Sequence, residues 1–181
     1  FMPESIIVAI ANVDRERDFT VTKIKTKRIN TMGGGRNFLN FIEKELIPYI
    51  DMNYRTVPFR TLVGHSLGGL LTINSYMDSN SLFNAYLAID PSIWWDEEMM
   101  TDKVDSLSSI SLEKKLYIAT ANQGEARAER NKKRHDALYA LLKKASSENV
   151  NVEIEYFEEE NHRSVPLIAL YKGLKYIIRE D

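Results

Sequence analysis

The chain has 181 residues, of which 44% are hydrophobic and 28% charged, a globular composition that excludes a disordered or collagen-like chain. Its formal net charge of −2 gives no electrostatic reason to expect a nucleic-acid partner or an anionic membrane surface. With no cysteine it has neither a disulfide nor a thiolate nucleophile, and no apolar run approaches the roughly 20 residues that span a bilayer.

The first third of the chain combines a predicted strand, a long loop and a helix. Residues 5–10 form a continuous β-branched apolar run, which predicts a strand covered on both faces inside a parallel sheet. Residues 12–31 are polar and lack clear periodicity, so they predict a loop. From Asn37 onwards apolar residues recur every four positions and predict a helix, whose last turn Pro48 should kink or cut.

The rest of the chain alternates predicted strands with predicted helices. The strands are expected at residues 61–64, 85–89, 115–121 and 151–157. The helices are expected at residues 70–77, 126–145 and 164–179. The last strand alternates apolar with acidic residues, as a half-exposed edge strand does.

This order of elements predicts the fold class. Strands that alternate with helices, with no linker or repeat between them, indicate one α/β domain whose mainly parallel sheet has helices on both faces. In open sheets of this kind ligands bind outside the carboxyl ends of the strands. Chemistry is therefore expected in the residues that directly follow positions 64, 89, 121 and 157.

A G-x-S-x-G pattern follows the strand at 61–64 and precedes a predicted helix. It reads Gly64-His65-Ser66-Leu67-Gly68-Gly69. Such a turn is strained and tightly packed, so a side chain at either flanking glycine should collide with its neighbours. The pattern predicts Ser66 as a nucleophile at the sheet edge; the alternative is a glycine-rich connection with a capping serine.

A serine nucleophile needs a base, and the chain offers three histidines. His65 is adjacent to Ser66 in the turn, so its ring should project away from the hydroxyl and flank the site. His135 lies in a charged stretch that reads as a solvated helix face. His162 follows the last strand at the same sheet edge as Ser66, and we predict it as the base, with a plain surface-loop histidine as the alternative.

The acid that would orient the base has three candidates. The chain order Ser, acid, His is that of the α/β-hydrolases. Glu125, four residues beyond the predicted fourth strand, is the first choice, and Glu129 is the next. Asp90 directly follows the third strand and is the third option. The acidic run at 158–160 reads as a solvated loop.

Several motifs together resemble the putative-esterase (esterase D-like) family of α/β-hydrolases, in particular its siderophore-esterase branch. Residues 12–18 are similar to the family's N-x-D-R-x-R-D segment, and residues 38–54 to the helix before its nucleophile strand. Residues 64–69 resemble G-H-S-x-G-G, and residues 82–95 resemble L-F-x-x-Y followed by S-P-S-x-W-W. Asn161-His162 is similar to the catalytic-histidine region. The resemblance spans nearly the whole chain.

The resemblance implies ester hydrolysis through an acyl-enzyme. Ser66 would be the nucleophile, and His162 the base and then the acid. The amide of Leu67 would supply one oxyanion donor. Trp94 and Trp95 would lie beside the pocket and contact an aromatic acyl group, with plain core packing as the alternative for each.

Departures from the family pattern keep two points open. Asp90 stands where the family more often has Ser, so it is a candidate acid or pocket residue, and His65 is expected beside the substrate. The family's acid varies and some members work with a Ser-His pair alone, so Glu125 is dispensable on that reading. No cofactor and no metal are expected. The expected partner is a small-molecule ester, namely a siderophore trilactone or, alternatively, an acetylated or feruloylated carbohydrate. The other alternative for the function of the chain is a non-catalytic binding module.

The resemblance also bears on the length. In the family's element order, residues 5–10 correspond to the fourth strand and residues 61–64 to the fifth. The first three strands are then lacking, and the 181 residues are expected to be the C-terminal part of a single hydrolase domain, with a gap in the sheet centre and half an oxyanion hole. Direct pairing of the two strands would contradict this. A leader upstream would imply a periplasmic or secreted protein; otherwise a cytoplasmic one is expected.

Overall fold

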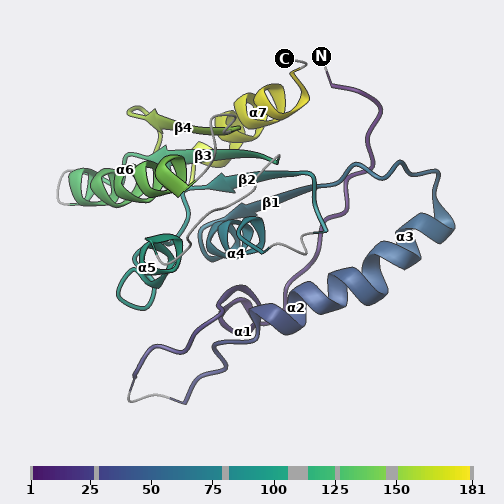
Figure 1. Ribbon diagram of the computed structural model, residues 1–181, viewed down its shortest axis with the longest axis horizontal. Helices are drawn as coiled ribbons and strands as arrows, with labels where there is room; N and C mark the ends of the chain where they lie inside the picture. Colours follow the sequence, from purple (N-terminus) through teal and green to yellow (C-terminus); the bar gives the residue numbers. More distant parts are fainter. Residues whose placement is uncertain are drawn as a thin grey trace.

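A parallel four-stranded sheet forms the centre of the structure, a computed structural model that describes residues 2–26, 29–78, 82–105, 114–124, 127–145 and 151–179. Its strands are β1 (Thr61–His65), β2 (Ala85–Ile89), β3 (Lys115–Ala121) and β4 (Val152–Phe157). They lie side by side in chain order and all run parallel (Figure 1). The predicted α/β class is confirmed, and β4 lies at an edge as expected.

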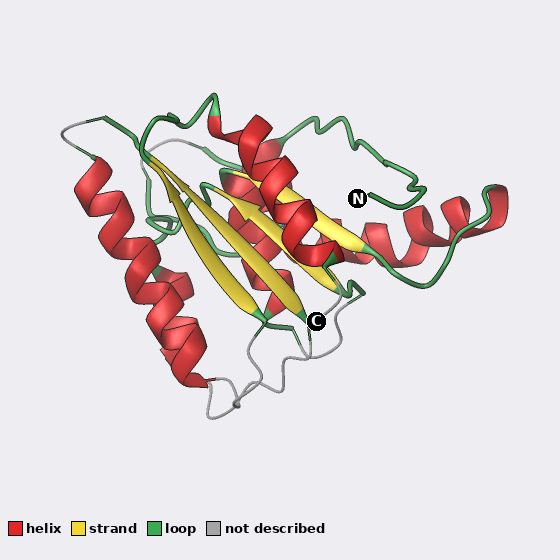
Figure 2. Ribbon diagram, turned by 90° about the horizontal axis from the view of Figure 1, so that it is seen from above, coloured by secondary structure: helices red, strands yellow, loops and turns green. Residues whose placement is uncertain are grey.

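Helices cover both faces of this sheet. One face carries α4 (Leu67–Tyr76) and α6 (Ala128–Ala145), with α5 (Met99–Asp105) packed against α6. The opposite face carries α7 (Val165–Ile178) (Figures 1 and 2). All five residues of β2 are buried, because the strand is covered on both sides.

Alternate residues of the strands feed two separate cores. Tyr86 and Ile118 belong to the core beneath α4 and α6, while Leu87 and Tyr117 belong to the core beneath α7. This is the two-residue period of a strand with both faces buried. The helices and strands predicted from residue 61 onwards are confirmed, with boundaries shifted by at most three residues. The short helix α5 was not predicted.

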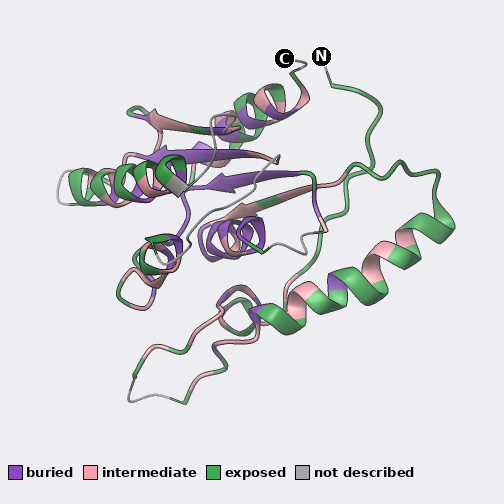
Figure 3. Ribbon diagram, viewed as in Figure 1, coloured by how far each residue is buried: buried purple, intermediate pink, exposed green. Residues whose placement is uncertain are grey.

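The predicted strand over residues 5–10 is wrong. The segment is extended but exposed along its whole length, with Ile7 83% exposed, and no described strand pairs with it (Figure 3). A β-branched run becomes a strand only where a neighbouring strand completes its hydrogen bonds and a layer covers its side chains. The segment is also not paired with β1, which forms one edge of the sheet.

The helix predicted from Asn37 is present but contains an unusual turn. It consists of α2 (Gly35–Phe41), the π-helical η1 (Ile42–Leu46) and α3 (Ile47–Asn53). The amide of Ile47 donates to the carbonyl of Ile42, five residues back. This wider turn lies just before Pro48 and makes room for the proline ring. The ring was expected to kink or cut the last turn of the helix. The helix continues to Asn53.

The predicted loop at 12–31 contains a short helix, α1 (Arg15–Phe19). Asp14 caps it by accepting from the amide of Arg17 at 3.0 Å. Asp18 accepts from Asn12 Nδ2 at 2.8 Å and pairs with the Arg17 guanidinium. The charged residues of the segment therefore pair with one another and hold the loop. Within the described ranges, no helix combines the length and apolarity that crossing a membrane requires.

Candidate active site

Ser66 occupies the turn between β1 and α4 in a strained conformation. Its φ is 60° and its ψ is −120°, a region that residues other than glycine rarely adopt. Hydrogen bonds on both sides of the residue hold this conformation: its amide donates to the carbonyl of Ile89 at 3.0 Å, and its carbonyl accepts from the amide of Ser92 at 3.1 Å. The turn is thus fastened to the end of β2 and the loop beyond it.

The glycines around Ser66 do not all act as expected. A Cβ atom at Gly64 would lie 2.2 Å from the carbonyl oxygen of Gly68, so the first glycine of the pattern is required by space. A Cβ atom at Gly69 would approach Pro91 to 3.0 Å. At Gly68 a Cβ atom would meet no described atom within 4 Å, so the expected collision there is wrong.

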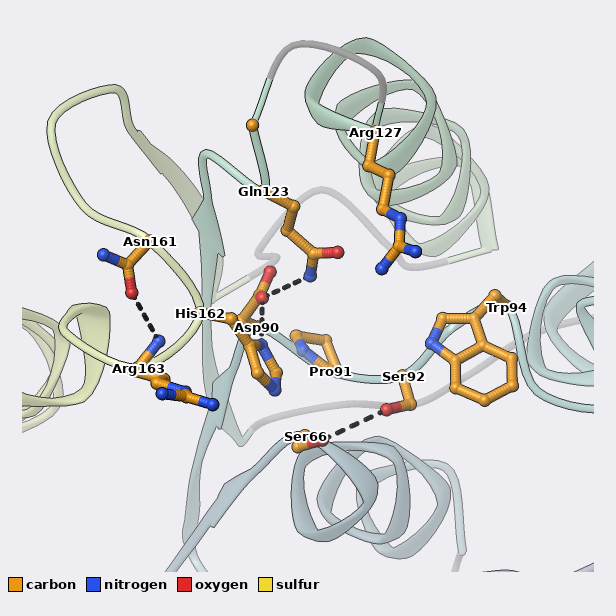
Figure 4. Close-up of a pocket in the computed structure, with 11 residues that line it drawn as sticks. Ser66, Asp90, Pro91, Ser92, Trp94, Gln123, Arg127, Asn161, His162 and Arg163 are labelled. Carbon is orange, nitrogen blue, oxygen red and sulfur yellow. Dashed lines mark hydrogen bonds and ion pairs between the residues drawn. The ribbon is translucent and has the colours of Figure 1, made fainter.

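The carboxyl edge of the sheet brings four polar side chains together (Figure 4). Ser66 follows β1, Asp90 follows β2, Gln123 comes after β3, and His162 lies in the loop after β4. Because the strands are parallel and in register, their carboxyl ends meet at one edge, as predicted. All four residues line a cavity of about 500 Å³.

Asp90 and His162 form a short hydrogen-bonded pair. Nδ1 of His162 lies 2.5 Å from Oδ2 of Asp90. Burial alone would raise the pKa of Asp90, but hydrogen bonds from His162, the amide of Ala121 and Gln123 outweigh it and lower this pKa below its ordinary value. The carboxylate is therefore ionised, and it fixes the imidazole tautomer in which Nδ1 carries the proton.

The structure gives different answers for the three candidate acids. Asp90, the third option, is the carboxylate that contacts His162. Glu125, the first choice, lies outside the described residues. Glu129 is exposed on α6 and pairs with Lys133 at 2.8 Å, so it is not part of this site.

Ser66 and His162 line the same cavity. In Figure 4 the imidazole lies between the Asp90 carboxylate and Ser66. The Ser66 hydroxyl oxygen is 3.4 Å from Oγ of Ser92. Among the residues that the structure describes, the hydrogen-bond partner of the Ser66 hydroxyl is Ser92, so a contact between this hydroxyl and His162 remains a prediction.

His65 flanks the base, as expected from its place beside Ser66. Its ring lies against that of His162, with centroids 4.4 Å apart and the planes tilted by 38°. Burial, with a further contribution from His162, lowers the pKa of His65, so its imidazole is neutral at pH 7. It does not line the cavity, so a direct contact between His65 and a substrate there remains a prediction.

The expectation that His135 lies on a solvated helix face is wrong. Its side chain is fully buried between α6 and the sheet. Its Nε2 donates to the carbonyl of Pro91 at 3.2 Å, and its Nδ1 accepts from the hydroxyl of Thr120. Burial lowers the pKa of His135 to about 4, which keeps the ring neutral. The inner face of α6 continues from His135 to Leu138 and Leu142, and the charged neighbours point elsewhere.

The two tryptophans have separate places. Trp94 is 48% exposed and lines the cavity. Trp95 is 3% exposed and belongs to the core, so its expected place beside the pocket is wrong and plain core packing is correct. Leu67 is the first residue of α4, where backbone amides have no partner inside the helix and the helix dipole is positive. The role of this amide as an oxyanion donor remains a prediction.

Reasoning from the sequence missed several side chains at the site. Gln123, Arg127 and Arg163 line the cavity, and the side chain of Asn131 donates to Asp90. The first three lie just after the ends of β3 and β4, where chemistry was expected, so their positions were a usable signal. Asn131 could be found only by knowing which face of α6 points inward. In the described part of the chain, no group of three His, Cys, Asp or Glu side chains could hold a metal ion.

Comparisons with known proteins identify similar chains. The family model described as "Putative esterase" matches residues 2–165. Ferri-bacillibactin esterase BesA of Bacillus subtilis is 29% identical, over 92% of this chain and 62% of the relative. An IroE-like serine hydrolase from Shewanella oneidensis superposes with a TM-score of 0.75 at 32% identity, covering 91% of this chain and 57% of that one. The BES protein from Bacillus cereus also gives 0.75, at 29% identity, covering 92% and 64%. The chain thus spans about three fifths of the length of these relatives.

Proposed function

The chain belongs to the putative esterase family, and we propose that it hydrolyses carboxylic esters with Ser66 as nucleophile, His162 as base and Asp90 as the orienting acid. One observation carries this proposal: the 2.5 Å contact between His162 and Asp90 lies at the same sheet edge as a strained serine turn. Several relatives named as siderophore esterases support the reaction class.

The geometry suits acyl transfer through a covalent intermediate. Oγ of Ser66 attacks the ester carbonyl carbon while its proton moves to Nε2 of His162, and the Asp90 carboxylate stabilises the imidazolium. His162 then gives this proton to the leaving alcohol, which leaves an acyl ester on Ser66. A water molecule, deprotonated by His162, attacks that ester; the acid product departs and the proton returns to Ser66.

The negative charge of each tetrahedral intermediate needs donors. The amide of Leu67 is placed at the positive end of α4, next to the nucleophile. A donor of this type is worth roughly 10²–10³ in kcat. The Leu67 amide thus serves as one half of an oxyanion hole.

The cavity favours an aromatic and negatively charged ester. Arg127 and Arg163 point into it from opposite sides, and the Trp94 ring forms part of its wall (Figure 4). The only carboxylate among the described lining residues is Asp90, which is buried and occupied by hydrogen bonds. Guanidinium groups attract anionic ligands, and a flat ring stacks on an aromatic acyl group. A catecholate siderophore ester has both properties, whereas an acetylated carbohydrate has neither.

Ser66→Ala tests the reaction. We expect turnover of a p-nitrophenyl ester to fall by at least roughly 10⁴-fold with the circular dichroism spectrum unchanged. A fluorophosphonate probe should label the parent protein at Ser66 and leave the variant unlabelled. Retained turnover in the variant would refute the nucleophile, and a folded parent protein that neither reacts with the probe nor turns over esters would indicate a binding module.

The substrate class is tested by direct comparison. A triscatecholate siderophore ester, a feruloyl ester and an acetylated xylan are assayed side by side with the same preparation. We expect the largest kcat/KM for the siderophore ester, and Arg127→Gln and Arg163→Gln should lower that value while leaving turnover of a neutral p-nitrophenyl ester unchanged. A preference for acetylated xylan would contradict the assignment.

A further inference from the structure

The carboxylate of Asp90 accepts four hydrogen bonds, two on each oxygen. Oδ1 accepts from the amide of Ala121 at 3.1 Å and from Nδ2 of Asn131 at 3.0 Å. Oδ2 accepts from Nε2 of Gln123 at 2.6 Å and from Nδ1 of His162 at 2.5 Å. A carboxylate has about four acceptor positions, so the group is fully occupied. Only one of the four donors is the base.

The other three donors decide how this carboxylate is turned. The terminal torsion of an aspartate is broad, so covalent geometry alone does not aim either oxygen. Here the donors come from the end of β3, from the loop after it and from α6, and the Asp90 side chain is fully buried. With Oδ1 held by Ala121 and Asn131, the second oxygen is left facing Gln123 and His162 (Figure 4).

Helix α6 also holds the backbone next to Asp90. His135 lies one turn after Asn131 and donates to the carbonyl of Pro91 at 3.2 Å. Asp90 itself has a positive φ of 37°, which is unfavourable for a residue with a side chain. Contacts from α6 on both its side chain and the following peptide keep Asp90 in this conformation.

We propose that Gln123 and Asn131 are positioning residues of the reaction, which act through Asp90 by turning its carboxylate toward His162 and by sharing its charge. This role rests on the proposed function, since it presumes that Asp90 orients the base. It makes the acid of this enzyme a three-residue unit rather than a single side chain.

The role predicts a shift in pH dependence as well as a loss of rate. Gln123 contributes a hydrogen bond that lowers the pKa of Asp90, so removal of this hydrogen bond raises that pKa. The acid limb of the kcat/KM profile should therefore move to higher pH. Among the residues that the structure describes, the other charged or titratable side chains that face this pair or line its cavity are His65, His135, Arg127 and Arg163. Arg15 acts on His65 rather than on the pair.

The variants are Gln123→Leu and Asn131→Leu, measured beside the parent protein. We expect kcat for a p-nitrophenyl ester to fall roughly ten- to hundredfold in each, which corresponds to the loss of one hydrogen bond to a charged group, with KM changed less than twofold. Lys132→Leu is the matched control, because Lys132 is next to Asn131 on α6 but has a side chain that is 45% exposed and pairs with Asp136. It should keep the parent's kcat and pH profile.

A second measurement does not depend on turnover. The chain has three histidines, so the imidazole ¹⁵N resonances of His162 can be assigned with single His variants. In the parent protein Nδ1 should carry the proton and exchange it slowly with water. In Gln123→Leu and Asn131→Leu this exchange should be at least about tenfold faster. Gln123 is only partly buried, so its variant carries the test if Asn131→Leu fails to fold.

The experiments distinguish an error in the positioning role of Gln123 and Asn131 from an error in the proposed function. If Ser66→Ala retains ester turnover, the proposed function is overturned and the positioning role with it. If Ser66→Ala is inactive while both leucine variants keep the parent's kcat, acid limb and Nδ1 exchange rate, the positioning role alone is overturned. An equal loss of rate in Lys132→Leu would also overturn it.

Discussion

Two regions of the molecule differ in how completely their side chains are partnered. At the carboxyl edge of the sheet, Asp90 accepts four hydrogen bonds, and the strained Ser66 is held through both its amide and its carbonyl. In the segment over residues 5–10, by contrast, Ile6, Ile7 and Val8 are exposed, and no described strand pairs with them. Both stretches of the chain carry a strong local sequence pattern. Such a pattern gives a defined structure only where neighbouring elements supply hydrogen-bond partners and cover the side chains.

The largest effect is expected from a substitution of Asp90, which lies at the centre of the hydrogen-bonded group at the carboxyl edge of the sheet. Asp90→Asn leaves the size of the side chain but removes the charge and offers a donor where Nδ1 of His162 needs an acceptor. We expect kcat for a p-nitrophenyl ester to fall roughly 10⁴-fold, the scale seen when a triad acid loses its charge. Glu129→Gln is the matched control, since that carboxylate is exposed and should leave kcat unchanged. A fall of less than tenfold would show that Ser66 and His162 act without an acid.

A paired truncation measures the packing difference between the two regions. Leu87 is fully buried in β2, and Ile7 is 83% exposed. Leu87→Ala should lower the free energy of unfolding by about 2–5 kcal/mol because it leaves a cavity. Ile7→Ala should change it by no more than about 0.5 kcal/mol. Urea denaturation of both variants gives the comparison, and equal losses would mean that the segment is buried in solution.

The buried histidine makes stability depend on pH. Burial lowers the pKa of His135 to about 4, whereas an unfolded chain binds this proton near pH 6.5. Between these values the unfolded state takes up a proton that the folded state does not. The free energy of unfolding should therefore fall as the pH is lowered from about 7 to about 4, by at most about 1.4 kcal/mol per pH unit for this group.

Urea denaturation at pH 7 and pH 5 checks this, with His135→Gln as the comparison. That variant should lose most of the difference between the two pH values. His65, whose pKa burial also lowers, contributes with the same sign and remains in both proteins. Asp90 titrates below this window, because its pKa lies under the ordinary value. An unchanged pH dependence in the variant would rule out His135 as its source.

The smallest effect separates two kinds of exposed apolar side chain. Trp94 and Ile7 are both exposed, but only Trp94 lines the cavity. Trp94→Ala should raise KM for an aromatic ester about three- to tenfold, the scale of one aromatic contact, with little change in kcat. Ile7→Ala should leave KM unchanged. Equal KM values for aromatic and aliphatic esters in the parent protein would contradict a stacking role for Trp94.

Local pattern was sufficient to predict the elements from β1 onwards. Continuous apolar runs mark strands covered on both faces, and the spacing of Leu138 and Leu142 marks the inner face of α6. The same spacing extends back through His135 to Asn131, but the charged residues between them favoured a solvated reading. Ser66 became a candidate because it directly follows β1, and His162 because it lies in the loop after β4.

The choice of acid could not be made from local pattern. Asp90 and Glu125 both satisfy the order Ser, acid, His, and both follow a strand. Which carboxylate contacts His162 depends on how the loop after β4 crosses the end of β3, where the amide of Asn122 donates to the carbonyl of Glu160 at 2.8 Å. Contacts between residues so far apart in the chain leave no trace in periodicity or composition.

The 2.6 Å contact between Gln123 and Asp90 also has an evolutionary consequence. The two side chains meet from the ends of two neighbouring strands, so a carboxylate placed at position 123 would lie next to the place that the Asp90 oxygen now occupies. Paired changes at these two positions would hand the acid from one loop to the next while the nucleophile and the base stay where they are. If Asp90 is the orienting acid as proposed, the scaffold thus allows the acid to change position without a change at Ser66 or His162.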